Sequence, residues 1–233
     1  MPRRKTNDTN TTAPATSHTP ATERGGDFSF PLPGKALKAL LAHAHADRPG
    51  MSAVMVHPSG YAWSTDGHRL LLVGPGLPAS GQDMDGHTRD YIPIERSDIA
   101  VAAKVAGARG IVEIARTAGR VTIRVKEARK IGKDELVPVT VGEWTVSPAE
   151  ISPPNVAQVV RICDSRFAPN PPPATTTFAA NPAYIVSAAE AVTAIGASAM
   201  RIYPGTEDTD PIVVCAETPE VGRALALVMP MRL

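Results

Sequence analysis

One arrangement of apolar and polar positions occurs three times along the chain: an apolar stretch, a helical stripe that begins seven residues later, and then several short apolar runs. The seven-residue spacing separates Phe30 from Leu37, Ile92 from Ile99, and Phe178 from Ile185. Each stripe continues at the three- or four-residue spacing of an amphipathic helix. Its further members are Leu40, Leu41 and Ala44 in the first copy, Ala102, Ala103 and Ala106 in the second, and Ala188, Ala189 and Val192 in the third. The chain is therefore predicted to contain three related modules, numbered one to three below.

Short apolar runs between turn residues predict the strands of each module. They lie at 51–56, 61–64 and 69–73 in module one, at 111–115, 120–125 and 143–146 in module two, and at 200–203, 212–216 and 224–228 in module three. The basic segment 126–133 is expected to be a hairpin tip, and the Gly- and Pro-rich segment 74–89 a loop. Asn181-Pro182 suits the start of the third helix, and Gly196 suits its C-terminal cap. Helices and strands in this order predict an α+β fold.

The same pattern suggests where the chain divides. Residues 1–27 lack hydrophobic periodicity, so we expect a disordered tail, whose basic start at Arg3 either touches nucleic acid or simply aids solubility. Modules one and two are expected to form one domain at 28–162. The segment 163–176 is rich in proline and predicts an extended linker, which leaves module three alone at 177–233.

Composition excludes some classes of protein. The chain is 43% hydrophobic but only 4% aromatic, so its core must consist mainly of aliphatic residues. A formal net charge of +1 argues against nucleic-acid binding through bulk charge, although one face can still be basic. Cys163 and Cys215 fit no metal spacing and are expected to be unpaired thiols in a reducing cytoplasm. No apolar run of membrane-spanning length and no signal peptide is present, so we expect a cytoplasmic protein without a membrane partner.

Candidate catalytic groups do not converge in the sequence. His43 and His45 would point to different sides of a helix and make a poor metal pair. Ser64, Asp66 and His68 could be combined into a catalytic triad, but neighbours in one strand and turn point in alternating directions, and a lone Asp-Gly-His is weak evidence for a triad. The chain has no phosphate-binding glycine motif, and the acidic run 207–210 lacks calcium-loop spacing. We therefore expect no enzyme, no metal and no cofactor; a hydrolase using His68 would be the alternative and would lose its activity in His68→Ala.

Two stretches carry a resemblance to a known family. They are Ser-Thr-Asp-Gly-His-Arg-Leu at 64–70 and Val-Met-Pro-Met-Arg-Leu at 228–233, and they look like motifs of the bacterial sliding clamp, the β subunit of DNA polymerase III. A third stretch, 153–160, resembles the end of that family's middle domain, but Val156 and Gln158 replace an aromatic residue and an arginine. The resemblance implies a sliding-clamp-like fold of about one and a half clamp domains. Modules one and two resemble the middle domain, and module three resembles the C-terminal half of the last domain.

The resemblance also implies a groove that captures short hydrophobic motifs of DNA polymerases and repair proteins. An extended peptide needs apolar pockets and a few orienting polar groups, and methionines suit varied ligands. We expect the apolar chain end and residues 65–70 to form opposite walls, with Thr65, His68, Arg69 and Arg232 as hydrogen-bond donors. The implied groove residues are Met51, Thr65, Gly67, His68, Arg69, Leu70, Pro154, Gln158, Val159, Leu227, Met229, Pro230, Met231, Arg232 and Leu233.

Further partners follow from the same resemblance: a clamp loader, double-stranded DNA and other copies of the chain. Cations expected to face DNA lie along the first two helices, at Lys35, Lys38, Arg96, Lys104 and Arg109. The family's first domain and the first half of its last domain have no counterpart here, so the usual dimeric ring does not carry over. The apolar stripe of the third helix should be covered by another chain or by rearranged packing. The alternative function is a non-ring adaptor, decoy or regulator that keeps the groove but does not encircle DNA.

Overall fold

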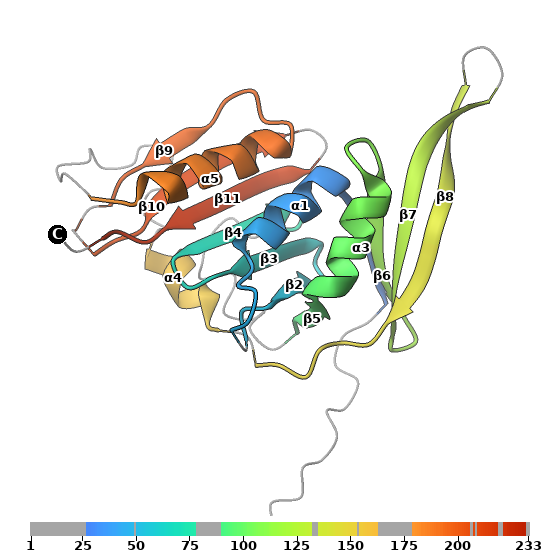
Figure 1. Cartoon of the computed structure of the whole chain (residues 1–233), viewed down its shortest axis with the longest axis horizontal. Helices are drawn as coiled ribbons and strands as arrows, with labels where there is room; N and C mark the ends of the chain where they lie inside the picture. Colours follow the sequence, from blue (N-terminus) through green and yellow to red (C-terminus); the bar gives the residue numbers. More distant parts are fainter. Residues whose placement is uncertain are drawn as a thin grey trace, which may run out of the picture.

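In the part of the chain that can be described, two antiparallel sheets lie against a row of helices (Figure 1). The computed structural model describes residues 27–48, 50–77, 90–131, 135–152, 154–162, 179–205, 207, 209–218 and 221–231. The elements are β1 (Phe28–Pro33), α1 (Gly34–His43), β2 (Ala53–His57), β3 (Tyr61–Thr65), β4 (Arg69–Gly74), β5 (Ile92–Glu95), α3 (Arg96–Ala106), β6 (Ile111–Thr117), β7 (Arg120–Ile131), β8 (Glu135–Val146), α4 (Val156–Ile162), α5 (Pro182–Ala194), β9 (Arg201–Tyr203), β10 (Ile212–Thr218) and β11 (Gly222–Val228).

The two sheets mix strands from different modules. One has the order β1-β6-β7-β8, and the other has the order β5-β2-β3-β4-β11-β10-β9. Modules one and two thus exchange their first strands. β11 pairs with β4 in an antiparallel register that places Leu227 opposite Leu70 and Val228 opposite Arg69. Module three therefore continues the sheet of module one.

The three long helices lie side by side, with α1 between α3 and α5 (Figure 1). The stripes predicted for α1 and α3 are largely buried: Leu37, Leu40, Ile99 and Ala102 have no exposed surface. In α5, Ala188, Ala191 and Val192 are buried, whereas Ile185 and Ala189 are only partly covered. The stripe is rotated relative to the prediction because α5 packs against α1 as well as against β10 and β11. Part of its apolar face is thus covered within the chain by rearranged packing, whereas Val186 of the same helix is 55% exposed.

Close approach of α1 to the end of α3 depends on a glycine. The Gly34 amide donates to the Gly110 carbonyl at 2.9 Å. A Cβ at Gly34 would lie 2.7 Å from the Gly107 carbonyl oxygen and 2.8 Å from the Ala106 Cβ. Any larger residue would force the two segments apart.

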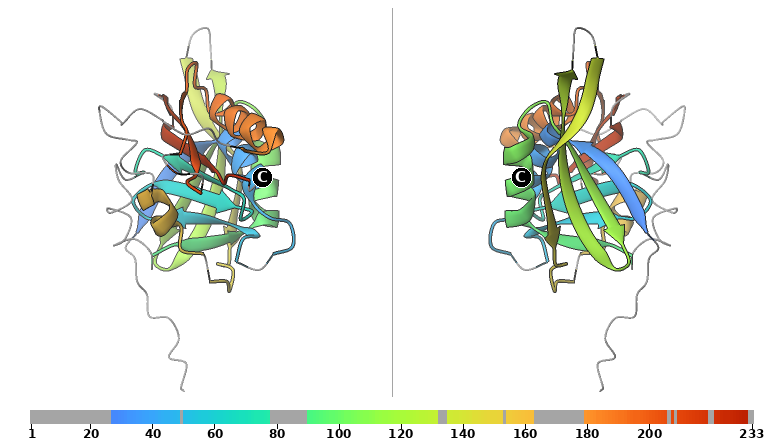
Figure 2. Two further views of the ribbon diagram at one scale, coloured as in Figure 1. Left: turned by 90° about the vertical axis from the view of Figure 1, so that its left-hand side faces the viewer. Right: turned by 90° about the vertical axis from the view of Figure 1, so that its right-hand side faces the viewer.

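The structure differs from the predicted pattern in two places, one within module two and one just after it. The segment predicted as a hairpin tip is strand as far as Ile131, because β7 runs to that residue and pairs with β8 through it. Beyond Lys126, which pairs with Ile111 of β6, these two strands form a two-stranded arm that Figure 1 shows projecting from the sheet. The short helix α4 was not predicted and lies on the face of the larger sheet opposite to the helix row (Figure 2).

Some predictions lie outside the described residues. These are the tail up to residue 26, most of the loop at 74–89, the linker at 163–176, Cys163 and the strand around Phe178. Cys215 is a free thiol, as expected. Among the helices of the described segments, none is long and apolar enough to cross a membrane.

Candidate functional site: a hollow between the large sheet and α4

A tight turn from Thr65 to Arg69 joins β3 to β4 and shapes one side of the site. The Asp66 carboxylate accepts the backbone amides of His68 and Arg69 at 2.9 and 2.8 Å. The Thr65 hydroxyl donates to the Arg69 carbonyl at 2.6 Å and accepts from the Gly67 amide. Gly67 has a φ of +91°, a conformation that glycine adopts without strain. The turn is therefore held by its own side chains before any ligand is present.

The Arg69 side chain fixes this turn to two helices. Its guanidinium donates to Asp66 Oδ2 at 2.9 and 2.7 Å, to the Ala42 carbonyl at the end of α1 at 3.1 Å, and to Ser187 Oγ of α5 at 2.7 Å. It also lies 5.0 Å from the ring centre of Tyr184. Partial burial would raise the pKa of Asp66, but the hydrogen bonds from Arg69 and from the turn amides outweigh it, so the pKa falls below its usual range.

An apolar hollow of about 180 Å³ lies between this turn, the end of β11 and the segment around α4. It brings together three parts of the chain that are far apart in sequence. The predicted groove residues that line it are Met51, Thr65, Gly67, Arg69, Leu70, Pro154, Val159, Leu227 and Met229. Asn155 and Val156, which belong to the stretch 153–160 but were not among the expected groove residues, complete the lining.

The relation between the two motifs differs from the expected opposite walls. β4 and β11 are neighbouring strands of one sheet, and the Met229 amide continues the pairing by donating to the His68 carbonyl at 2.9 Å. The two motifs therefore form one side of the hollow together. Pro154 and Val159 provide the other side, since α4 packs on this face of the sheet. Met51 approaches Gly67 of the turn.

The remaining predicted groove residues lie elsewhere or cannot be placed. Gln158 is exposed on α4, and Pro230 and Met231 do not line the hollow. Met231 is 50% exposed, and its amide is held by the Ala179 carbonyl. Arg232 and Leu233 lie outside the described residues.

His68 and Tyr184 form an aromatic pair beside the hollow. Their rings are stacked with centroids 5.8 Å apart, and Tyr184 lies in the first turn of α5. Sequence reasoning missed Tyr184, although it is the one aromatic residue of that helix. The expected donors Thr65 and Arg69 direct their polar groups to the turn and to the helices. Their main contribution to the hollow is therefore its shape, because these donors already have partners within the protein.

The basic residues predicted to face DNA lie on the helix row. Lys35 and Lys38 of α1, Arg96 and Lys104 of α3, and Arg109 just after α3 are all exposed. Helix α5 has no Lys or Arg and carries Glu190. The positive charge is thus confined to two of the three long helices.

The candidate catalytic groups do not assemble. The Ser64 hydroxyl is buried and donates to the Leu40 carbonyl at 2.6 Å, while the Asp66 carboxylate is bound to Arg69. The His68 ring stacks on Tyr184. Within the described segments, no group of three or more His, Cys, Asp or Glu residues is arranged to hold a metal ion.

The fold is similar to those of solved bacterial sliding clamps. The DNA polymerase sliding clamp from Pseudomonas aeruginosa matches with a TM-score of 0.51 and 16% identity, over 91% of this chain and 68% of that chain. DNA polymerase III subunit beta from Borrelia burgdorferi, in complex with a natural product, matches with a TM-score of 0.52 and 13% identity, over 88% of this chain and 63% of that chain. The DnaN sliding clamp from Bartonella birtlesii, bound to griselimycin, matches with a TM-score of 0.51 and 16% identity, over 94% of this chain and 70% of that chain.

These matches show a sliding-clamp-like α+β fold in a strongly divergent sequence. The chain spans about two thirds of the length of the clamps it matches. No protein-family model matches it, and no curated protein matches it in sequence.

Proposed function

We propose that the chain is a non-catalytic, sliding-clamp-like protein that binds short apolar motifs of DNA polymerases or repair proteins in the hollow beside α4. The observation that carries this proposal is the convergence of three distant segments, including both motifs that resemble the clamp family, on one apolar hollow. At about 180 Å³ it is smaller than the 300–1,000 Å³ typical of drug-sized ligands, which suits a few side chains of an extended peptide.

The binding energy would come mainly from apolar contact. Leu70 and Leu227 are buried in the floor, so they are already in place. Met51, Val159 and Met229 are partly exposed and can adapt to a ligand side chain. The turn from Thr65 to Arg69 is already ordered by its own hydrogen bonds, so little entropy is lost in ordering it when a peptide binds. This favours affinity.

A charge placed in the hollow tests the proposal. Val159→Glu should weaken binding of a fluorescent peptide with an apolar clamp motif by about tenfold or more, because the peptide would desolvate the carboxylate. Gln158→Glu is the matched control, since Gln158 is the exposed neighbour on the same helix and does not line the hollow. Fluorescence polarisation measures both affinities, and circular dichroism verifies folding. Equal affinity of the two variants would remove the hollow as the binding site.

A DNA-related role is proposed for the basic helix row, with sequence-independent phosphate contacts. The alternative is an adaptor or decoy that binds the same peptides without encircling DNA. One observation favours this alternative: Ala188, Ala191 and Val192 of α5 are buried against elements of the same chain, so their burial does not require a second chain. The mass in solution, together with retention on closed circular DNA, separates the two. A monomer that is not retained would support the adaptor.

A further inference from the structure

Module three lacks, on its outer side, the cover that modules one and two provide for each other. β1 of module one pairs with β6 of module two, and β5 of module two pairs with β2 of module one. The helices α1 and α3 of these modules pack side by side. In the part of the chain that the structure describes, β9 pairs with β10 alone and ends the large sheet, and no helix lies beyond α5 in the helix row (Figure 1).

The first residue of the α5 stripe is less covered than its counterparts. Leu37 of α1 and Ile99 of α3 begin the equivalent stripes, and neither has any exposed surface. Ile185 begins the stripe of α5 and is only partly buried. Ser187 and Ala194 line the seam between α5 and α1. At about 100° per residue, Ile185 lies on the opposite side of α5 from both, where a neighbouring helix is missing.

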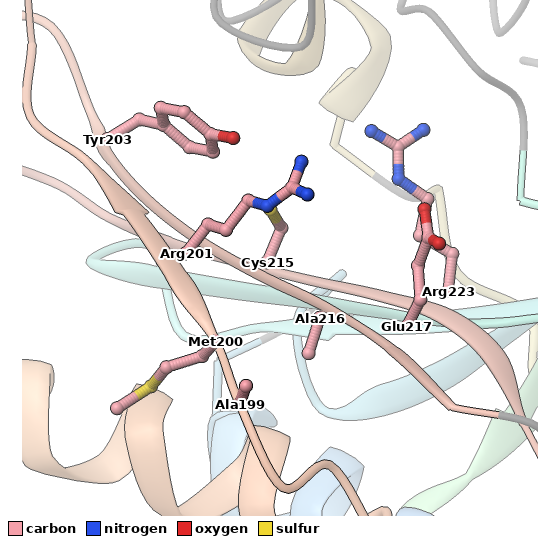
Figure 3. A pocket seen from close by; sticks show the side chains of 8 residues that line it. All are labelled: Ala199, Met200, Arg201, Tyr203, Cys215, Ala216, Glu217 and Arg223. Carbon is pink, nitrogen blue, oxygen red and sulfur yellow. The ribbon is translucent and has the colours of Figure 1, made fainter. Parts of the chain in front are cut away.

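The outermost strand shows the same difference. In module one, Val54 and Val56 of β2 belong to the main core, and α3 contacts this strand and leaves both residues without exposed surface. Ile202 of β9 pairs with Val214 of the same core, so its side chain also points to the helix side of the sheet. Ile202 is nevertheless 47% exposed. Figure 3 shows Met200, also exposed, on the side of the strands where α5 lies.

These exposed or partly exposed residues of α5 and the β9 region form an uncharged surface, the outer patch. It consists of Ile185, Ala189, Met200 and Ile202. Glu190, the one charged residue of α5, lines the seam with α1 instead. Arg201 points to the opposite face of the sheet (Figure 3). An uncharged patch can meet its own copy across a two-fold axis without repulsion, whereas it offers no complementary charge to an acidic or a basic partner.

We propose that module three of one chain pairs with module three of a second copy through the outer patch, so that the two α5 helices lie beside each other as α1 and α3 do. The contact follows the one inside the chain, where modules one and two meet through equivalent surfaces. Such a contact is isologous and therefore closes at two chains. A patch of four residues is small, so the dimer should dissociate on dilution. This inference goes beyond the proposed function and does not depend on it.

Sedimentation equilibrium of the full chain, from about 1 μM to about 1 mM, tests the inference. The mass should rise from one chain to two and stop there. Ile202→Glu should weaken the association about tenfold or more, because the dimer would bury a carboxylate without a partner. Leu136→Glu is the matched control, since Leu136 is an exposed apolar residue on β8, in the other sheet. It should leave the association unchanged.

A second variant guards against misfolding. Circular dichroism verifies that Ile202→Glu is folded, and Met200→Glu, placed just before β9, should weaken the association in the same direction. Both variants should bind the apolar clamp-motif peptide with the affinity of the wild type. Failure of the dimer is thus distinguishable from failure of the proposed peptide site.

Three results would overturn the inference. The chain could stay monomeric up to about 1 mM, which would leave the patch to a different protein or to solvent. The association could be weakened by Leu136→Glu and not by the two patch variants, which would place the contact elsewhere. The mass could rise beyond two chains, which would show a head-to-tail contact instead of a two-fold one.

Discussion

Arg69 connects the turn at the hollow to both α1 and α5. It is one of the residues that line the hollow, yet its guanidinium is bonded to Asp66, Ala42 and Ser187. Hydrogen bonds to charged groups contribute about 1.5–3 kcal/mol each when their partners are buried, and less where water competes. The position of this side chain thus depends on the packing of α5, which links the shape of the hollow to the third module.

The burial of His43 should make the stability of the protein depend on pH. Burial lowers the pKa of His43 below 6.5. Nδ1 lies 2.9 Å from the Ala39 carbonyl and carries the proton, while Nε2 has no hydrogen-bond partner in the described part of the protein. Below about pH 6.5 the unfolded chain therefore binds a proton at His43 more readily than the folded chain does. The free energy of unfolding should therefore fall as the pH drops below about 6.5, by up to about 1.4 kcal/mol per pH unit from this group.

Urea unfolding at several pH values measures this effect. His43→Gln cannot take up the proton, so its free energy of unfolding should change less between about pH 7.5 and pH 5.5 than that of the wild type. An identical pH dependence in both proteins would show that His43 does not titrate in this range.

At the scale of elements, α5 is held against α1 and the sheet by small residues. Ala188 is fully buried in the main core, whereas Ala183 is exposed in the first turn of the same helix. Ala188→Leu should reduce the free energy of unfolding by about 1–3 kcal/mol through overpacking. Ala183→Leu, the matched control, should change it by less than about 0.5 kcal/mol. Equal effects of the two substitutions would contradict the packing of α5 described above.

Most elements were predictable because their periodicity reports burial directly. The stripes of α1 and α3 and the runs around Gly60 and Asp66 correspond to observed helices and strands. The rotation of α5 was not predictable, since it depends on contact with α1 that no local pattern encodes. The extension of β7 and β8 was missed because its charged residues, including Arg129 and Lys130, match a solvated loop equally well.

The candidate site was predicted in part, and through the family resemblance more than through periodicity. Residues of the turn and of β11 were identified because their motifs are distinctive. Asn155 and Val156 lie in the stretch 153–160 that the resemblance pointed to, but they were not among the expected groove residues. Tyr184 was missed, since aromatic residues near helix starts have many structural roles. That the two motifs lie on neighbouring strands follows from the pairing of β4 with β11, a contact between distant parts of the chain.

At the scale of the whole molecule, the helix row presents positive charge on α1 and α3 only. If this face contacts DNA, each phosphate contact should add about 0.9 to the slope of log affinity against log salt concentration. Lys38→Glu and Lys104→Glu should each weaken binding of a short duplex and reduce the slope by about one. Arg161→Glu is the control, because Arg161 is exposed on α4, on the opposite face of the large sheet. Slopes equal to that of the wild type would exclude these helices as the DNA contact.

The central claim is that a short apolar peptide occupies the hollow beside α4, and methionine methyl groups report on it directly. Met51 and Met229 line the hollow, whereas Met200 lies at the far edge of the sheet and Met55 is buried in β2. In a protein with ¹³C-labelled methionine methyl groups, each assigned by substitution to leucine, we expect a clamp-motif peptide to shift the resonances of Met51 and Met229 in a saturable manner. Those of Met200 and Met55 should stay in place. Saturable binding that leaves Met51 and Met229 unchanged would contradict the account.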